Sequence, residues 1–198
     1  MYEYLVDKGD DGVPVLTEPL LASPYLQLTS ESGPRHLVFH PAADDFWYLI
    51  SELDSTVSTL SYDTATGQVS LLNTISTLPP PYDSVDMAAG EIQISRDGRF
   101  VYCSNRDVSE SNLGRSSLSV FAVDNKQLVY LQTISSFGIH PRHFILHDTY
   151  VIIANRDSDN LVVMSREPES GLLEEPVSEN IFTSPHLTNP VQVLIFDI

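Results

Sequence analysis

Basic residues and cysteine are both scarce in this sequence. Its 198 residues hold 10 Lys and Arg against 27 Asp and Glu, which gives a formal net charge of −17. This charge repels phosphate backbones and anionic lipid surfaces at long range, so we expect neither a nucleic acid nor a membrane as a partner. The one cysteine, Cys103, excludes an internal disulfide and is typical of a reducing compartment.

Signals of several other protein classes are missing as well. No stretch approaches the roughly 18 apolar residues of a membrane span, and the first residues lack the basic and apolar regions of a signal peptide. These absences predict a cytoplasmic protein. No Cys/His cluster has zinc spacing, no glycine-rich loop leads from a strand into a helix, and no Gly-x-Ser-x-Gly segment is found. We therefore expect no metal and no cofactor.

The chain instead contains three copies of a segment with four short apolar strands. In each copy the second strand ends in a polar pair, and these pairs start at positions 51, 105 and 155, which are 54 and then 50 residues apart. The pairs are Ser51-Glu52, Asn105-Arg106 and Asn155-Arg156. Repeats of about 40 to 50 residues with four strands each are typical of β-propeller blades. The sequence predicts one all-β domain over residues 1–198, a β-propeller of four-stranded antiparallel blades whose ring is incomplete.

Period-2 alternation and turn residues place the full blades at residues 33–77, 90–136 and 140–183. The expected strands are 37–40, 46–51, 56–62 and 69–76 in the first blade, 92–95, 100–104, 117–123 and 128–135 in the second, and 144–147, 150–154, 161–165 and 175–182 in the third. We expect Gly67 to supply the positive φ of a hairpin turn. No segment shows a helical stripe.

Both ends of the chain read as parts of further blades. Residues 1–22 contain two segments, 2–6 and 15–20, that are expected to be the third and fourth strands of an earlier blade. Residues 190–197 are expected to begin with the first strand of a further blade. Because an open ring exposes sheet edges, we expect a piece of a longer chain, a truncated product, or a homo-oligomer formed through the open edges.

Strand alternation places two kinds of link on one face of such a ring. The residues on these links are Arg35, His36, Glu91, Arg142 and His143 before or within first strands, and Glu52, Arg106 and Arg156 after second strands. Four of the eight arginines lie at these positions. Guanidinium groups form a rigid fork for carboxylate or phosphate, so the pattern predicts a site for a small anion. The alternative is that each arginine pairs with a neighbouring acid and only ties blades together.

Four motifs resemble the seven-bladed lactonase family, which includes 6-phosphogluconolactonases and carboxy-cis,cis-muconate cyclases. They are Gly33-Pro-Arg-His36, residues 51–57, residues 91–106 and residues 154–160. They occur in the family's order, and the resemblance runs over nearly the whole chain. The resemblance implies that the chain matches the C-terminal half of a member. It implies functional roles for Arg35, His36, Glu52 and Arg106. We accordingly expect Glu52, His36 and Arg106 to be catalytic and Arg35 to bind substrate, and the place of the remaining residues in the repeats predicts that they bind substrate too; these are Glu91, Arg142, His143, Asn155 and Arg156.

The function implied by this resemblance is hydrolysis of a small anionic sugar lactone, such as 6-phosphogluconolactone. Arginines would hold the anionic group, and Glu52 or His36 would act as general base or acid. A lactonising cyclase of the carboxymuconate type and a non-catalytic propeller that binds other proteins remain as alternatives. The sequence departs from the family pattern at Gln93, His143 and Arg156, where the resemblance implies His, Asp and Gln.

Overall fold

Strands dominate the computed structural model, which describes residues 5–8, 14–17, 26–81 and 84–195. The strands are β1 (Leu5–Lys8), β2 (Pro14–Thr17), β3 (Pro34–Phe39), β4 (Phe46–Ser51), β5 (Thr56–Asp63), β6 (Gln68–Ser76), β7 (Met87–Ile94), β8 (Phe100–Asp107), β9 (Ser117–Asp124), β10 (Gln127–Ser135), β11 (Pro141–Leu146), β12 (Tyr150–Asn155), β13 (Asn160–Ser165) and β14 (Ile181–Thr183). Two short 3₁₀ turns, η1 (Arg156–Ser158) and η2 (Ser178–Asn180), complete the set. None of the described residues forms an α-helix, and hence none forms a helix able to cross a membrane.

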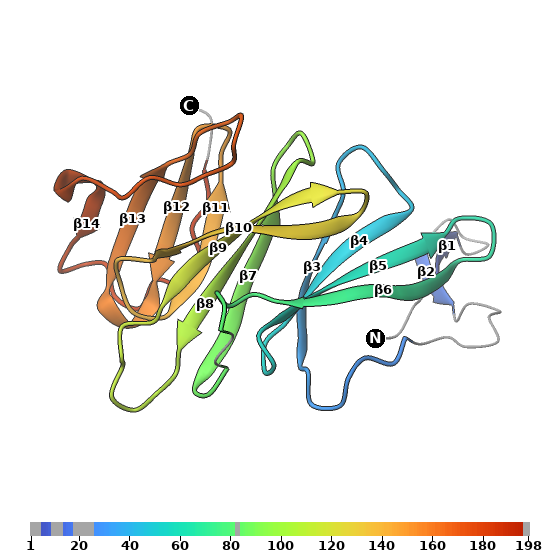
Figure 1. Cartoon of the computed structure of the whole chain (residues 1–198), viewed down its shortest axis with the longest axis horizontal. Coiled ribbons are helices and arrows are strands. Elements are labelled where there is room, and N and C mark those ends of the chain that lie inside the picture. The colour runs from blue at the N-terminus through green and yellow to red at the C-terminus, as the bar shows by residue number, and fades with distance from the viewer. Residues whose placement is uncertain (1–4, 9–13, 18–25, 82–83, 196–198) are drawn as a thin grey trace.

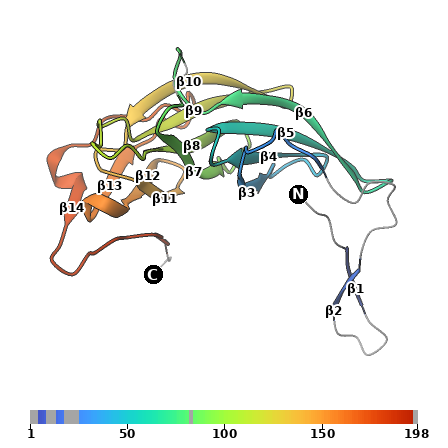
Figure 2. The same cartoon turned by 90° about the horizontal axis from the view of Figure 1, so that it is seen from below.

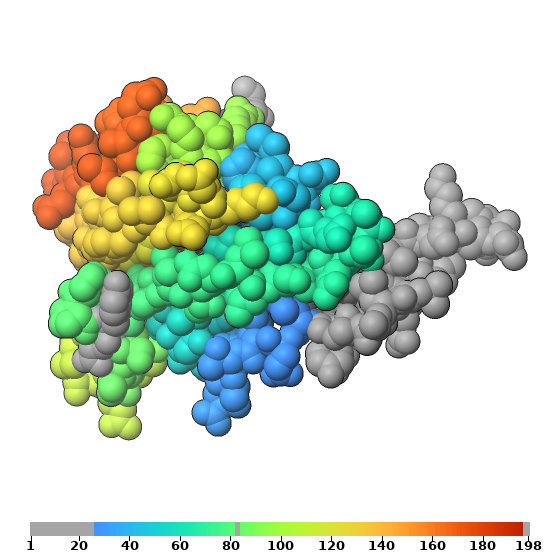
Figure 3. Space-filling view, turned by 45° about the vertical axis from the view of Figure 1, so that its right-hand side comes forward, coloured from blue at the N-terminus to red at the C-terminus, as the bar shows by residue number. Residues whose placement is uncertain are grey.

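Three antiparallel four-stranded sheets form the body of the molecule, as predicted. Their strand orders are β3-β4-β5-β6, β7-β8-β9-β10 and β11-β12-β13-β14, which we call the first, second and third blades. Figures 1 and 2 show the blades side by side in an open arc, with β3, β7 and β11 on its concave side. The outer strands β6 and β10 lie on the convex face in Figure 3, β10 in yellow and β6 in green. The molecule is thus an incomplete β-propeller.

Apolar side chains hold neighbouring blades together. One buried cluster joins the first and second blades and includes Tyr48, Ile50, Ile92, Cys103 and Phe121. A second cluster joins the second and third blades and includes Tyr102, Leu118, Phe144, Ile153 and Met164. Because both faces of the second blade are covered, every residue of β8 is buried. Burial also raises the pKa of the Cys103 thiol, so this cysteine is a packing residue.

A glutamine amide links two inner strands that do not pair with each other. Gln93 on β7 donates from Nε2 to the carbonyl of Phe144 at 2.7 Å. The Leu146 amide of β11 donates to Gln93 Oε1 at 2.9 Å. One side chain therefore sets the distance between the first strands of the second and third blades.

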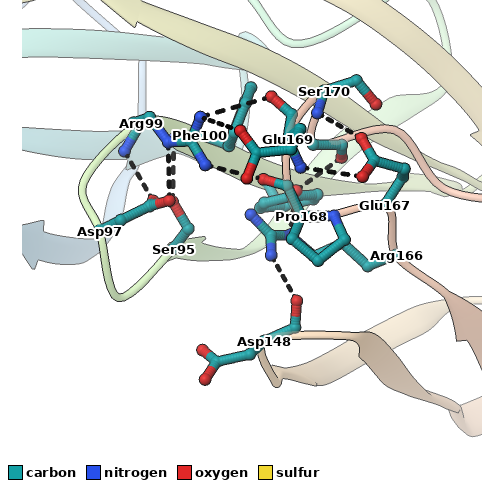
Figure 4. Close-up of polar contacts among 12 residues, drawn as sticks. Ser95, Asp97, Arg99, Phe100, Asp148, Arg166, Glu167, Pro168, Glu169 and Ser170 are labelled. Atoms are coloured by element: carbon teal, nitrogen blue, oxygen red, sulfur yellow. Dashed lines mark hydrogen bonds and ion pairs between the residues drawn. The ribbon is translucent and has the colours of Figure 1, made fainter.

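Polar contacts tie the same two blades at the rim formed by the β7–β8, β11–β12 and β13–β14 turns, which we call the far rim (Figure 4). Tyr102 donates to the Gly171 carbonyl at 2.6 Å. Arg166 donates from Nε to the Tyr102 hydroxyl and from Nη1 to the Asp148 carbonyl, each at 2.6 Å. A turn of one blade is therefore bonded to a strand of its neighbour.

The expected turn chemistry is confirmed in the first blade. Gly67 has a φ of 73°, the left-handed conformation that a glycine adopts without steric cost. Its amide donates to the Asp63 carbonyl at 2.7 Å and closes the turn between β5 and β6.

The fourth strand of the third blade is much shorter than predicted. β14 covers Ile181–Thr183, whereas the sequence predicted a strand over 175–182. Pro176 has no backbone donor for a ladder, and the turn η2 interrupts the segment directly before β14. The prediction of a strand over 175–180 was therefore wrong.

The chain ends give two further outcomes. β1 and β2 form an antiparallel pair, and the remaining parts of the predicted strands 2–6 and 15–20 lie outside the described residues. Residues 190–195 form no strand, contrary to prediction. A strand needs a partner for its amides and carbonyls, and no strand of the described ranges pairs with this segment.

Candidate active site

The rim opposite the far rim, which we call the site rim, gathers most of the predicted residues. Arg35 and His36 lie on β3, Glu52 follows β4, Glu91 lies on β7 and Arg106 on β8, while Arg142 and His143 lie on β11. These strands alternate in direction, so the starts of β3, β7 and β11 and the ends of β4 and β8 meet at one edge. The same-face placement expected from the repeats is what brings them together.

Glu52 is held between two guanidinium groups. Arg106 Nη2 lies 2.6 Å from Glu52 Oε1, and Arg35 Nε lies 3.4 Å from Oε2. Burial disfavours the charged carboxylate, but the hydrogen bond and charge of Arg106 with the charge of Arg35 outweigh burial and lower the pKa of Glu52. The side chain is 35% exposed, so an ionised carboxylate faces solvent at the site rim.

Arg106 is occupied by protein groups. Its side chain is only 5% exposed, and Nη2 also donates to the Ala89 carbonyl. Nη1 lies 3.3 Å from Nε2 of His140. This guanidinium therefore supports Glu52 and has little surface left for a ligand.

Arg142 has different surroundings. Among the described residues it has no hydrogen-bond or ion-pair partner, although its charge acts on Arg35, Glu52 and His140. Arg35 in turn donates to the Gly90 carbonyl at 3.0 Å. Burial and then the charges of Arg142 and Arg106 lower the pKa of Arg35. Arg142 is thus the guanidinium of the cluster that is best placed to bind an external anion.

A second group of polar side chains lies next to the first, on the concave side. Glu91 accepts at Oε1 from Nδ1 of His36 at 2.9 Å, and its Oε2 lies 3.5 Å from Nε2 of His143. The Val193 amide donates to Nδ1 of His143, which leaves Nε2 to donate to Glu91. Burial, more than any neighbour, lowers the pKa of His143. The His36 side chain is 43% exposed and its ring nitrogens lie 2.9 Å from Arg35 Nη1.

An open cavity of about 700 Å³ runs along the facing parts of β3 and β7. Its polar lining consists of Arg35, His36, Glu91 and Gln93. This volume lies within the range of small-molecule sites. The described residues contain no cluster of three or more His, Cys, Asp or Glu arranged to hold a metal ion.

Asn155 and Arg156 stand apart from this cavity. Asn155 is fully buried and donates to the Ser136 carbonyl at 3.0 Å. Arg156 binds the neighbouring carboxylate of Asp157 at 2.6 Å. Arg156 therefore follows the alternative stated for the arginines, because it pairs with the acid beside it.

His140 is a site-rim residue to which the sequence analysis assigned no role. The motif His140-Pro-Arg-His143 repeats Gly33-Pro-Arg-His36, and Gly33 and His140 have φ of 66° and 60°. A non-glycine residue at a position where its repeat has glycine could have drawn attention to His140, because few side chains adopt positive φ.

Comparison with known proteins identifies similar chains. The family model described as "Lactonase, 7-bladed beta-propeller" matches residues 2–193. The chain is 33% identical over 147 residues to the 6-phosphogluconolactonase of Bacillus subtilis, covering 72% of this chain and 39% of that protein. It is 31% identical over 186 residues to the 6-phosphogluconolactonase of Formosa agariphila, covering 88% of this chain and 50% of that protein.

Solved structures agree with these relatives. A Lactobacillus plantarum protein superposes with a TM-score of 0.77 at 31% identity, covering 95% of this chain and 50% of that one. The periplasmic gluconolactonase of Pseudomonas aeruginosa superposes with a TM-score of 0.75 at 29% identity, covering 89% and 47%. The chain spans about half the length of the curated relatives it matches.

Proposed function

Because the chain belongs to the seven-bladed β-propeller lactonase family, we propose that it hydrolyses a small anionic sugar lactone of the 6-phosphogluconolactone type. The observation that carries this proposal is the Glu52 carboxylate, which is ionised, partly exposed and fixed between Arg35 and Arg106. Similarity to 6-phosphogluconolactonases supports hydrolysis rather than cyclisation.

Glu52 is the proposed general base. It takes a proton from a water molecule as the water oxygen bonds to the ring carbonyl carbon. The ring C–O bond then breaks, and the alkoxide that leaves receives the proton from Glu52, so the product is the open hydroxy acid. Two guanidinium groups keep Glu52 charged and aimed before the substrate arrives, which lowers the cost of reaching the transition state.

Arg142 and Arg35 are the proposed anion ligands. Arg142 has no partner among the described residues, and the charges of both arginines act on Glu52. A phosphate or carboxylate bound here would neutralise positive charge on two neighbouring guanidinium groups. A guanidinium near the carbonyl oxygen would also stabilise the charge that develops there.

His36 is a second proposed acid or base. Glu91 accepts from its Nδ1, which orients the ring in the way a carboxylate orients a catalytic histidine. Its exposure toward the cavity on β3 and β7 allows contact with a substrate. The cytoplasmic location and the homo-oligomer stay predictions.

The rate of lactone hydrolysis by the Glu52→Gln variant tests the proposal. We expect the rate constant with a phosphorylated δ-lactone to fall by about 100-fold or more, because an amide cannot accept the proton from water. The matched control is Glu169→Gln, a far-rim carboxylate that is 84% exposed, and its rate should equal that of the unchanged chain. Equal rates for Glu52→Gln and the control would remove Glu52 from the reaction. A folded chain without hydrolysis above background would overturn the proposed activity and favour the protein-binding alternative.

A further inference from the structure

His140 lies between charged groups from two blades. Its Nε2 is 3.3 Å from Nη1 of Arg106, at the end of β8 in the second blade. Its Nδ1 is 3.2 Å from Oδ2 of Asp157, in the η1 turn of the third blade. The ring is almost completely buried, with 8% of the residue exposed. It therefore contacts these neighbours rather than solvent.

The surroundings favour one neutral tautomer. Arg106 can only donate, so Nε2 of His140 must accept from it. Asp157 can only accept when ionised, so Nδ1 must carry the proton and donate to it. Nη2 of Arg156 also lies 3.4 Å from Nδ1 of His140. The same Nη2 donates to the Asp157 carboxylate at 3.1 Å, so this carboxylate can accept from both groups.

A comparison of equivalent positions in the three blades explains why a neutral group is needed at His140. Glu52 directly follows β4, Arg106 lies at the end of β8 and Arg156 directly follows β12, so the three occupy equivalent places in the blades. Glu52 and Arg106 have opposite charge and bind each other directly at 2.6 Å. Arg106 and Arg156 have the same charge, and the His140 ring lies between them. A neutral imidazole can accept from one guanidinium while its other nitrogen binds the carboxylate that balances the second.

We infer that His140 is a positioning residue that, held by Asp157, keeps Arg106 directed at Glu52. A polar chain then runs from Asp157 through His140 and Arg106 to Glu52 and crosses all three blades. This inference rests on the proposed role of Glu52, because the geometry of that carboxylate is what His140 would control. His140 itself is not one of the residues that line the cavity.

The charges that face His140 keep its ring neutral at pH 7. Burial has the largest effect, and Arg156, Arg106 and Arg142 add to it, so the pKa of His140 falls to about 4 although Asp157 opposes the change. A neutral ring is what the accepting role of Nε2 requires.

The tautomer can be measured directly on the ¹⁵N-labelled full chain. We expect long-range ¹H–¹⁵N correlation at pH 7 to show His140 with a protonated Nδ1 and an unprotonated Nε2. The loss of its signals in His140→Gln identifies the ring. The opposite tautomer, or a ring protonated on both nitrogens, would overturn the inference.

Two substitutions test the effect on Glu52. In His140→Leu the Nη1 group of Arg106 loses its acceptor, so the guanidinium is held less firmly against Glu52. The pKa of Glu52 should then rise by about one unit, which the ¹³C shift of its carboxyl carbon measures. His140→Gln keeps an oxygen that can accept from Arg106 and should restore most of the shift. Both variants place an unbranched Cβ at the same positive φ, so the added backbone strain is matched.

His147→Leu is the control, because His147 is an exposed histidine at the far rim. It should leave the pKa of Glu52 unchanged. An equal pKa of Glu52 in the His140→Leu and unchanged chains would overturn the inference. If His140→Leu does not fold, the tautomer and the His140→Gln titration still decide the question. None of these measurements uses turnover, so failure of the lactonase proposal would be seen separately, in the rates of Glu52→Gln.

Discussion

Arg166 at the far rim and Arg142 at the site rim belong to the same blade but have opposite surroundings. Arg166 is buried, donates to the Tyr102 hydroxyl and the Asp148 carbonyl, and lies 5.5 Å from the centre of the Phe100 ring. Arg142 is partly exposed and has no partner among the described residues. A guanidinium that donates to neutral acceptors and packs against aromatic rings joins neighbouring blades. A guanidinium near other cations, without a carboxylate of its own, is instead available to an external anion.

The largest expected effect concerns Arg106, the site-rim arginine that resembles Arg166 in being buried and bonded to protein groups through two of its nitrogens. Arg106→Ala should lower the free energy of unfolding by about 3 kcal/mol, because it leaves Glu52 without its closest cation and Ala89 without its donor. Urea denaturation measures the change, with Arg96→Ala as the control because Arg96 is 89% exposed. A loss below about 1 kcal/mol would mean that Arg106 is not a structural arginine.

The two rims should also differ in the pH range over which their side chains stop contributing to stability. The pKa of His140 is lowered from 6.5 to about 4, so the unfolded chain binds more protons in this window. Stability from His140 should be complete above pH 6.5 and fall by about 2 to 3 kcal/mol as the pH drops to 4. His140→Gln should flatten this part of the stability curve. A curve with the same slope in both chains would contradict the assignment.

At the far rim the pKa of the Asp97 carboxyl group is lower than the pKa of His140. Burial opposes its ionisation, but hydrogen bonds from Ser95 and Arg99 lower its pKa from the ordinary 3.8 to about 2. Its contribution is therefore present above pH 4 and lost only as the pH falls toward 2. Asp97→Asn should change the acid limb below pH 4 and leave the limb between 4 and 6.5 unchanged.

Arg166→Met should lower the free energy of unfolding by about 2 kcal/mol, because two hydrogen bonds and the contact with Phe100 are lost while the apolar volume is kept. Phosphate affinity at the site rim should not change. Calorimetric titration with inorganic phosphate provides the second measurement. Weaker phosphate binding in this variant would contradict the claim that only the site rim binds the anion.

Arg142→Ala is expected to have the smallest effect on stability, within about 0.5 kcal/mol, because no protein group loses a bond. The affinity for inorganic phosphate should fall about tenfold, which corresponds to about 1.4 kcal/mol. Arg96→Ala, which removes the same charge at the far rim, is the matched control for long-range electrostatics. Equal losses in the two variants would show that net charge alone attracts the anion.

The repeats predicted the architecture because blade order follows from period-2 strands and turn glycines such as Gly67. They also predicted which links meet at one rim, since strand alternation alone decides that. They did not separate Arg106 from Arg142. Both arginines occupy site-facing positions, and the difference depends on Glu52, which reaches Arg106 from the neighbouring blade and has no equivalent carboxylate beside Arg142.

Other outcomes depended on contacts that no local pattern encodes. Asn155 occupies the same repeat position as Asn105, and both are fully buried beneath a link, where their amides donate to main-chain carbonyls. In both pairs the asparagine is therefore structural, which a pattern of residue types alone does not reveal. His140 was missed because its importance comes from Asp157 and Arg106, which lie on either side of it only in the folded chain.

The amide of Gln93 also links the concave edges of the second and third blades. Adjacent inner strands of the second and third blades share no ladder, and at this depth a single side chain makes the pair of bonds that two backbones would otherwise exchange. The spacing of β7 and β11 therefore depends on the length of this glutamine as well as on the buried cluster between the two blades. A side chain of another length at this position would lose these two bonds and shift the inner strands, whereas the contacts of Glu52 with Arg35 and Arg106 involve none of these atoms.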